Sequence, residues 1–146
     1  MKLAIRNPTP SLVIAWKVLS FLASDPEVQL PLVGRADQWF CKERVAENEG
    51  ANYLIGVGLI YLQYSGALFD AMDPDVEVVV EVSDRFREML KDKKSSIWSV
   101  QGLRAGAEWS DLRRLSAEIL RICGWSVNLP KAPFEINQLI EVEGYM

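Results

Sequence analysis

Apolar residues recur at helical spacing in two well-bounded segments of the chain. The first covers residues 12–24, follows the turn-like sequence Asn7-Pro8-Thr9-Pro10-Ser11 and ends at Asp25-Pro26. Ser11 is expected to cap its first turn. The second covers residues 110–122, and its apolar positions (Leu112, Leu115, Ile119 and Ile122) stop at Gly124. Each pattern predicts an amphipathic helix with one buried face.

A third segment, residues 51–69, contains no charged residue and approaches the length needed to cross a bilayer. Polar residues and three glycines interrupt it, and acidic residues flank it without the lysine or arginine cluster that sets the orientation of a membrane helix. We therefore interpret it as a helix that is buried on most sides and extends to about Met72, and we expect no membrane span.

Residues 76–82 satisfy two templates. Val76, Val78, Val80 and Val82 alternate as in a strand, whereas the apolar positions between Val76 and Leu90 also line one helical face. The preceding Asp73-Pro74-Asp75 is a helix-start signature, with Asp73 as the cap and Pro74 at the first helical position. We therefore predict a helix over residues 76–94, and a strand at Val76–Val82 in an α+β fold is the alternative.

The remaining segments complete a mainly α prediction: one compact domain, residues 1–146, with about five helices. Another helix is expected over residues 37–49, and irregular connections over residues 29–34 and 95–107. Short peripheral strands are allowed at residues 1–6, 126–129 and 139–142. No internal repeat is present.

Composition places the chain among ordinary globular proteins. Hydrophobic residues make up 49% and charged residues 25% of 146 residues. The two cysteines, Cys41 and Cys123, form no CxxC pair, and so few cysteines in a chain of this size indicate reduced, buried thiols. Lys17 interrupts the only candidate secretory signal, so we expect a cytoplasmic protein.

Charge is distributed unevenly although the total is only −4. Residues 1–36 carry a net charge of +2, residues 37–81 carry −7, residues 82–131 carry +4 and the remainder carries −3. Acidic residues lie at both ends of the apolar segment: Glu43, Glu47 and Glu49 before it, and Asp70, Asp73, Asp75, Glu77 and Glu81 after it. This cluster predicts a negative patch that attracts basic partners, and a merely solvated, helix-capping role is the alternative.

Catalytic motifs are missing from the sequence. The chain has no histidine, which removes the commonest general base and the serine–histidine and cysteine–histidine pairs. It contains no GxSxG, GxGxxG, SxxK or phosphate-binding loop motif. Carboxylates such as Glu43 and Glu47 have no diagnostic spacing for glycoside hydrolysis or calcium binding. We therefore expect a protein that is not an enzyme and needs no cofactor or metal.

We do not expect this chain to bind nucleic acid. Nine basic residues in the stretch 84–121 supply positive charge, but six acidic residues lie in the same stretch and the pI is about 4.9. A helical DNA-binding regulator would need Arg113, Arg114 and Arg121 exposed together on one helix.

Five tryptophans give the chain more large aromatics than a core of this size needs. Trp16 continues an apolar face and Trp109 lies at a helix start, so both are expected in the core. Trp39 and Phe40 are adjacent and cannot both face one interior from a helix, which makes Trp39 a candidate interface residue.

These observations predict a non-enzymatic acidic protein that binds a basic protein and inhibits or neutralises it. Toxin immunity proteins and phage inhibitors of nucleic-acid-processing enzymes are of this class, because blocking a phosphate-binding cleft requires negative charge in the place of phosphate. The alternative is the helical DNA-binding regulator. The oligomeric state stays open. The expected partner-binding residues are Asp70, Asp73, Asp75, Glu77, Glu43, Glu47 and Trp39.

Overall fold

The computed structural model describes residues 9–33, 51–93, 95–127 and 129. In this part the chain forms six α-helices and one 3-10 helix and no strand, so the mainly α prediction is confirmed. The helices are α1 (Pro10–Ala23), α2 (Pro26–Val33), α3 (Ala51–Met72), α4 (Glu77–Met89), η1 (Ser96–Trp98), α5 (Val100–Ala105) and α6 (Ala107–Cys123).

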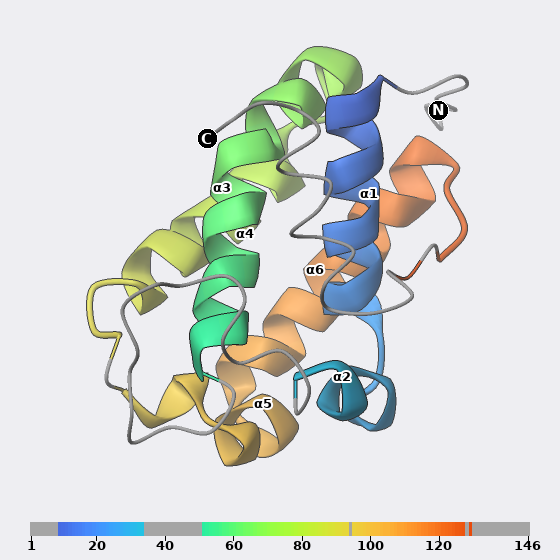
Figure 1. Ribbon diagram of the computed structural model, residues 1–146. Helices are drawn as coiled ribbons and strands as arrows, with labels where there is room; N and C mark the ends of the chain where they lie inside the picture. Colours follow the sequence, from blue (N-terminus) through green and yellow to red (C-terminus); the bar gives the residue numbers. More distant parts are fainter. Residues whose placement is uncertain (1–8, 34–50, 94, 128, 130–146) are drawn as a thin grey trace.

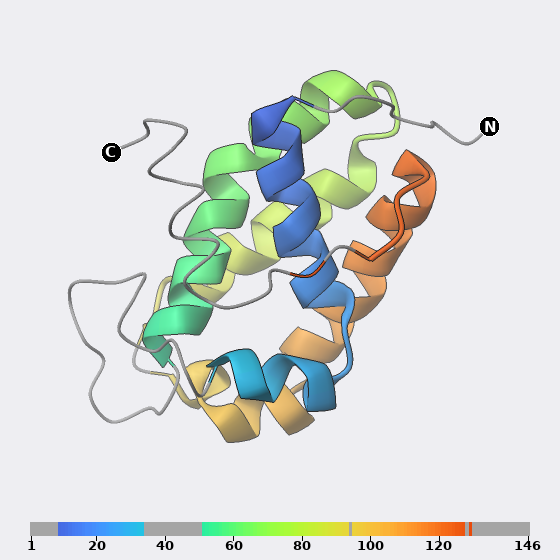
Figure 2. The ribbon, with the colours of Figure 1, turned by 45° about the vertical axis from the view of Figure 1, so that its right-hand side comes forward.

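The four longest helices form a bundle in which each helix packs against two others. Helix α1 lies between α3 and α6, and α4 packs against the same two helices from the other side. Neighbouring helices run in opposite directions (Figure 1). The start of α1, the turn between α3 and α4 and the end of α6 therefore share one end of the bundle, whereas α2 and α5 lie at the opposite end (Figure 2).

The predicted helix over residues 12–24 is present as α1, but its cap differs from the prediction. The Thr9 side chain accepts a hydrogen bond from the Leu12 amide at 3.3 Å, and Pro10 occupies the start of the helix. Ser11 lies inside the helix instead. Thr9 is extended and its hydroxyl can therefore reach the first turn, as an N-cap requires.

Helix α3 confirms the apolar helix predicted from residue 51. Between Leu54 and Met72 it is long and apolar enough to cross a membrane, with a mean hydropathy of 1.3. However, 56% of the residues of this window are buried inside the bundle, where α3 packs against α1 and α4.

Helix α4 settles the ambiguous valine segment in favour of a helix. Val79, Val82, Phe86 and Met89 form its buried face, at spacings of three and four residues. The strand alternative over Val76–Val82 is therefore wrong. Tertiary burial of one helical face outweighs the β-propensity of the valines.

Two segments predicted to be irregular are helical. Residues 29–34 fall largely in α2, where the buried Gln29 side chain donates hydrogen bonds to the carbonyls of Phe21 and Leu22. Residues 95–107 contain η1 and α5, whose first turns are capped by the Ser95 and Ser99 side chains. Ser95 and Ser99, in the segment predicted to be irregular, are thus helix caps.

The core centres on aromatic residues from three helices. Trp98, Trp109 and Phe86 are fully buried, and Trp109 contacts the other two edge to face. The Trp109 indole donates to the Ile97 carbonyl at 2.6 Å, so its polar atom is satisfied. The core placement predicted for Trp109 is confirmed.

The end of α6 is joined to α1 by an aromatic stack. Gly124 adopts the left-handed conformation (φ 71°) that ends the helix, as predicted. Trp125 then stacks on Trp16 with ring centroids 5.0 Å apart, and the Trp16 indole donates to the Ser126 carbonyl. Trp16 is half-buried at the edge of the core rather than inside it. Ser126, Val127 and Leu129 form no strand.

The helix predicted over residues 37–49 and the strands allowed at residues 1–6 and 139–142 lie outside the described residues.

Candidate functional site

The predicted partner-binding residues divide into two groups. Asp70 is exposed near the end of α3, Asp73 and Asp75 are exposed in the α3–α4 turn, and Glu77 is the exposed first residue of α4. The structure therefore brings these four acidic residues to one end of the bundle. Glu43, Glu47 and Trp39 lie outside the described residues.

Asp73 and Asp75 do not cap α4. The helix begins at Glu77, and its N-cap residue Val76 makes no side-chain cap hydrogen bond. Backbone bonds close the turn instead: the Asp75 amide donates to the Met72 carbonyl, and the Val76 amide donates to the Pro74 carbonyl at 2.8 Å. The predicted helix start at Asp73-Pro74 was thus too early, because Pro74 belongs to the turn. Neither aspartate side chain therefore accepts a capping hydrogen bond from the first turn of α4.

Acidic residues further along the same helix are neutralised by neighbours. Glu81 pairs with Arg85 at 3.1 Å, Asp84 with Arg87 at 3.3 Å, and Glu88 with Lys91 at 3.1 Å. By contrast, Asp70, Asp73, Asp75 and Glu77 have no ion-pair partner among the residues that the structure describes. Negative charge is therefore uncompensated in the α3–α4 turn and compensated along the rest of α4.

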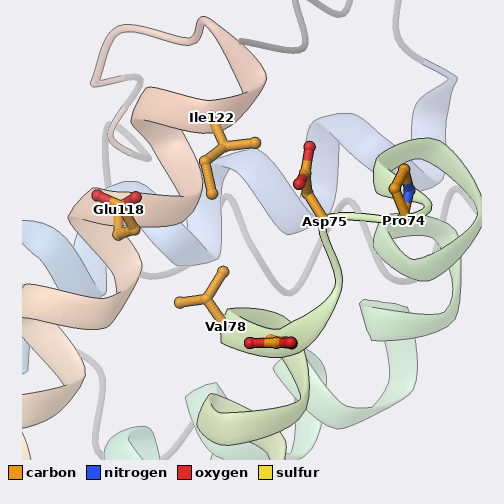
Figure 3. Close-up of a pocket in the computed structure, with 6 residues that line it drawn as sticks. Pro74, Asp75, Val78, Glu118 and Ile122 are labelled. Carbon is orange, nitrogen blue, oxygen red and sulfur yellow. The ribbon is translucent and has the colours of Figure 1, made fainter. Parts of the chain in front are cut away.

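This uncompensated charge borders an open pocket of about 330 Å³ between the start of α4 and the last turns of α6. We call it the α4/α6 pocket, and it is lined by Pro74, Asp75, Glu77, Val78, Glu118 and Ile122. Figure 3 shows Val78 and Ile122 pointing toward one another, with Asp75 and Glu118 on opposite sides of the gap. The pocket thus has apolar walls and an acidic rim.

The apolar walls follow from how α4 and α6 pack. Val79 and Val82 of α4 and Ile119 and Cys123 of α6 turn into the core. Val78 and Ile122 are next to these core positions and are only half-buried. These two aliphatic side chains therefore line the pocket between α4 and α6.

Glu118 is the acidic residue that α6 contributes to the pocket. Arg121 donates hydrogen bonds from Nε (3.0 Å) and Nη2 to its two carboxylate oxygens. This hydrogen bonding lowers the pKa of the Glu118 carboxyl, which keeps the group ionised. Both side chains are exposed to solvent, so the ion pair is weak and another cation can replace Arg121 at Glu118.

Sequence reasoning missed Val78, Glu118 and Ile122 as site residues. Glu118 and Ile122 are four residues apart and share one face of a helix, a signal that the sequence does contain. The position of this face opposite the α3–α4 turn depends on the packing of α6 against α4, which no local pattern encodes.

The described residues offer no cation site, because no group of three or more Cys, Asp or Glu side chains lies close enough to hold a metal ion there. The α6 arginines are also engaged within the fold. Arg113 donates to the Gln29 side chain at 2.8 Å and to the Leu103 carbonyl, and Arg114 lies 3.8 Å from Asp111. A helix face that displays Arg113, Arg114 and Arg121 together is therefore not formed.

Comparison with protein-family models, with curated proteins and with solved structures gives no match to this chain, so its function has to be argued from the geometry of the α4/α6 pocket and the charge around it.

Proposed function

We propose that this chain is a non-enzymatic, cytoplasmic protein that binds a basic protein through the α4/α6 pocket and the adjoining α3–α4 turn. The observation that carries the proposal is the contrast in charge compensation. Asp70, Asp73, Asp75 and Glu77 lack ion-pair partners among the described residues, whereas the acids of the later turns of α4 are paired.

The unpaired carboxylates and the apolar pocket beside them would favour association with a partner in different ways. Their summed field steers a positively charged partner and raises the rate of encounter. The half-buried Val78 and Ile122 then provide apolar contact, which gives affinity that charge alone does not. A surface that combines both suits a partner with exposed lysine or arginine residues.

Inhibition is the consequence that this chemistry favours. A basic surface that normally holds phosphate groups would be covered by carboxylates in their place, and the partner would lose its nucleic-acid substrate. The DNA-binding alternative gains no support, because Arg113 is half-buried and bonded to Gln29 and Leu103.

The experiment is a capture of partners from lysate of the native cell at low and high salt, with the tagged wild type and two variants. The double variant Asp75→Lys/Glu77→Lys reverses charge at the pocket. The control Glu88→Lys makes the same kind of change about 16 Å further along α4, where the acid is already paired with Lys91. Circular dichroism establishes that all three proteins are folded.

We expect the wild type and Glu88→Lys to retain a basic protein at low salt and to release it at high salt. The double variant should recover at least about tenfold less of it, because attraction becomes repulsion at the rim of the pocket. Equal recovery by all three proteins, or copurification of nucleic acid instead of protein, would refute the proposal.

A further inference from the structure

We infer that the α4/α6 pocket receives a single arginine side chain of the basic partner. The inference rests on the proposed function and adds to it the chemical group that enters the pocket. Its grounds are the size of the pocket, the nature of its walls, and the arrangement of carboxylates from two elements around it.

The pocket has room for one long side chain. A volume of about 330 Å³ equals that of about eleven water molecules in the liquid, and it lies at the lower end of the range for small-molecule sites. A folded element of a partner cannot enter such a space. One extended side chain can enter it while the partner backbone stays outside.

The walls suit an aliphatic stem. Val78 and Ile122 approach each other from α4 and α6, and both are half-buried (Figure 3). Lysine and arginine place their methylene groups on apolar surface and keep the charged head in a polar environment. A side chain that enters between the two aliphatic residues would therefore bring its cationic end to the acidic rim.

The rim selects a guanidinium over an ammonium. Asp75 and Glu77 approach from the α3–α4 turn and the start of α4, and Glu118 approaches from α6. A guanidinium is planar, has five N–H donors in a fixed fork, and is less strongly hydrated than an ammonium, so it can bond carboxylates on two sides at once.

Glu118 already accepts a guanidinium in this protein. Arg121 binds both of its carboxylate oxygens from the neighbouring turn of α6. A carboxylate offers about four lone-pair positions, so two remain for a second cation. The exposed Arg121 contact therefore adjusts to the incoming group and does not exclude it.

The test is a titration of the isotopically labelled protein followed by amide NMR shifts. The probes are two blocked pentapeptides, acetyl-Gly-Ser-Arg-Ser-Gly-amide and its lysine counterpart. The key variant Val78→Phe fills the pocket without any change in charge. The control Val80→Phe makes the same substitution two residues away, where the side chain is 39% exposed on α4 and does not line the pocket.

We expect the arginine peptide to shift the amides of Val78, Glu118 and Ile122 and to bind at least about threefold more tightly than the lysine peptide. Val78→Phe should weaken the arginine peptide about tenfold, whereas Val80→Phe should change its affinity by less than about twofold. Dispersed amide spectra establish that both variants are folded.

Equal affinity for the two peptides, or equal affinity of wild type and Val78→Phe for the arginine peptide, would overturn the inference. If the captured partner still binds Val78→Phe but not Asp75→Lys/Glu77→Lys, the arginine inference fails and the proposed function stands. If the charge-reversed variant also binds it, the proposed function fails as well.

Discussion

Two glycines of α3 occupy opposite environments on the same helix. A Cβ atom at Gly58 would lie 2.9 Å from Cδ1 and 3.1 Å from Cε1 of the buried Phe86 ring. A Cβ atom at Gly66 would meet nothing within 4 Å. Gly58 is therefore the point at which α3 approaches α4 closely, whereas Gly66 adds only backbone freedom to the unfolded chain.

Alanine at these two positions should change stability in opposite directions. Gly58→Ala forces Phe86 away from its packing with Tyr61 and Trp109, and we expect a loss of about 1–3 kcal/mol in the free energy of unfolding. Gly66→Ala should gain up to about 1 kcal/mol, because alanine favours the helix. Urea denaturation measures both. A similar change for both variants would contradict the close approach at Gly58.

At the scale of elements, helix α2 is held by one buried side chain. The Gln29 amide nitrogen donates to the carbonyls of Phe21 (2.8 Å) and Leu22 (3.3 Å) at the end of α1. Its oxygen accepts from Nε (3.2 Å) and Nη2 (2.8 Å) of Arg113 on α6. A single residue thus satisfies the last carbonyls of one helix and a guanidinium of another.

Removal of this side chain should loosen the whole of α2. Gln29→Ala removes the side-chain hydrogen bonds to two carbonyls at the end of α1 and leaves the half-buried Arg113 with the Leu103 carbonyl alone of its two acceptors, so we expect a loss of about 2–3 kcal/mol in the free energy of unfolding. Hydrogen exchange should quicken at the amides of α2. Val28→Ala, at a 40% exposed position of the same helix, should cost less than about 0.5 kcal/mol. Equal effects of the two variants would contradict this role for Gln29.

The long helices could be predicted from the sequence because their apolar period continues over several turns, as in Leu112, Leu115 and Ile119. Helices α2 and α5 could not, because they are short and depend on contacts distant in sequence, such as those of Gln29. The candidate site divides in the same way. Asp75 and Glu77 belong to a local acidic run that the sequence displays, whereas Glu118 joins them only through the packing of α6 against α4.

The stability of the whole molecule should depend on alkaline pH through two buried acids. Burial raises the pKa of the Cys123 thiol to about 12, and it raises the pKa of the Tyr61 hydroxyl, which donates to the Val79 carbonyl at 3.0 Å. An unfolded chain would ionise these groups at about 8.5 and about 10. The folded state holds protons that the unfolded state loses, so stability is full below about pH 8.5 and falls as pH rises toward 12.

Urea midpoints at pH 7, 9 and 10.5 test this linkage. We expect a progressive fall, and a smaller fall between pH 7 and 9 for Cys123→Ala, because this variant removes the buried thiol, which ionises at about 8.5 once the chain is unfolded. A thiol reagent should leave Cys123 unmodified in the folded protein and modify it in urea. Midpoints that stay constant up to pH 10.5 would contradict the buried, protonated state of both groups.

The packing of α1 against α6 also affects how the chain folds during translation. Helix α1 is complete at Ala23, but the helix that covers much of its buried face begins only at Ala107. Translation at about 5–20 residues per second takes roughly 4–17 s to cover that distance. During this interval Val18, Leu19 and Phe21 emerge without α6, so we expect the nascent chain to expose apolar surface of the kind that chaperones bind until α6 has left the exit tunnel.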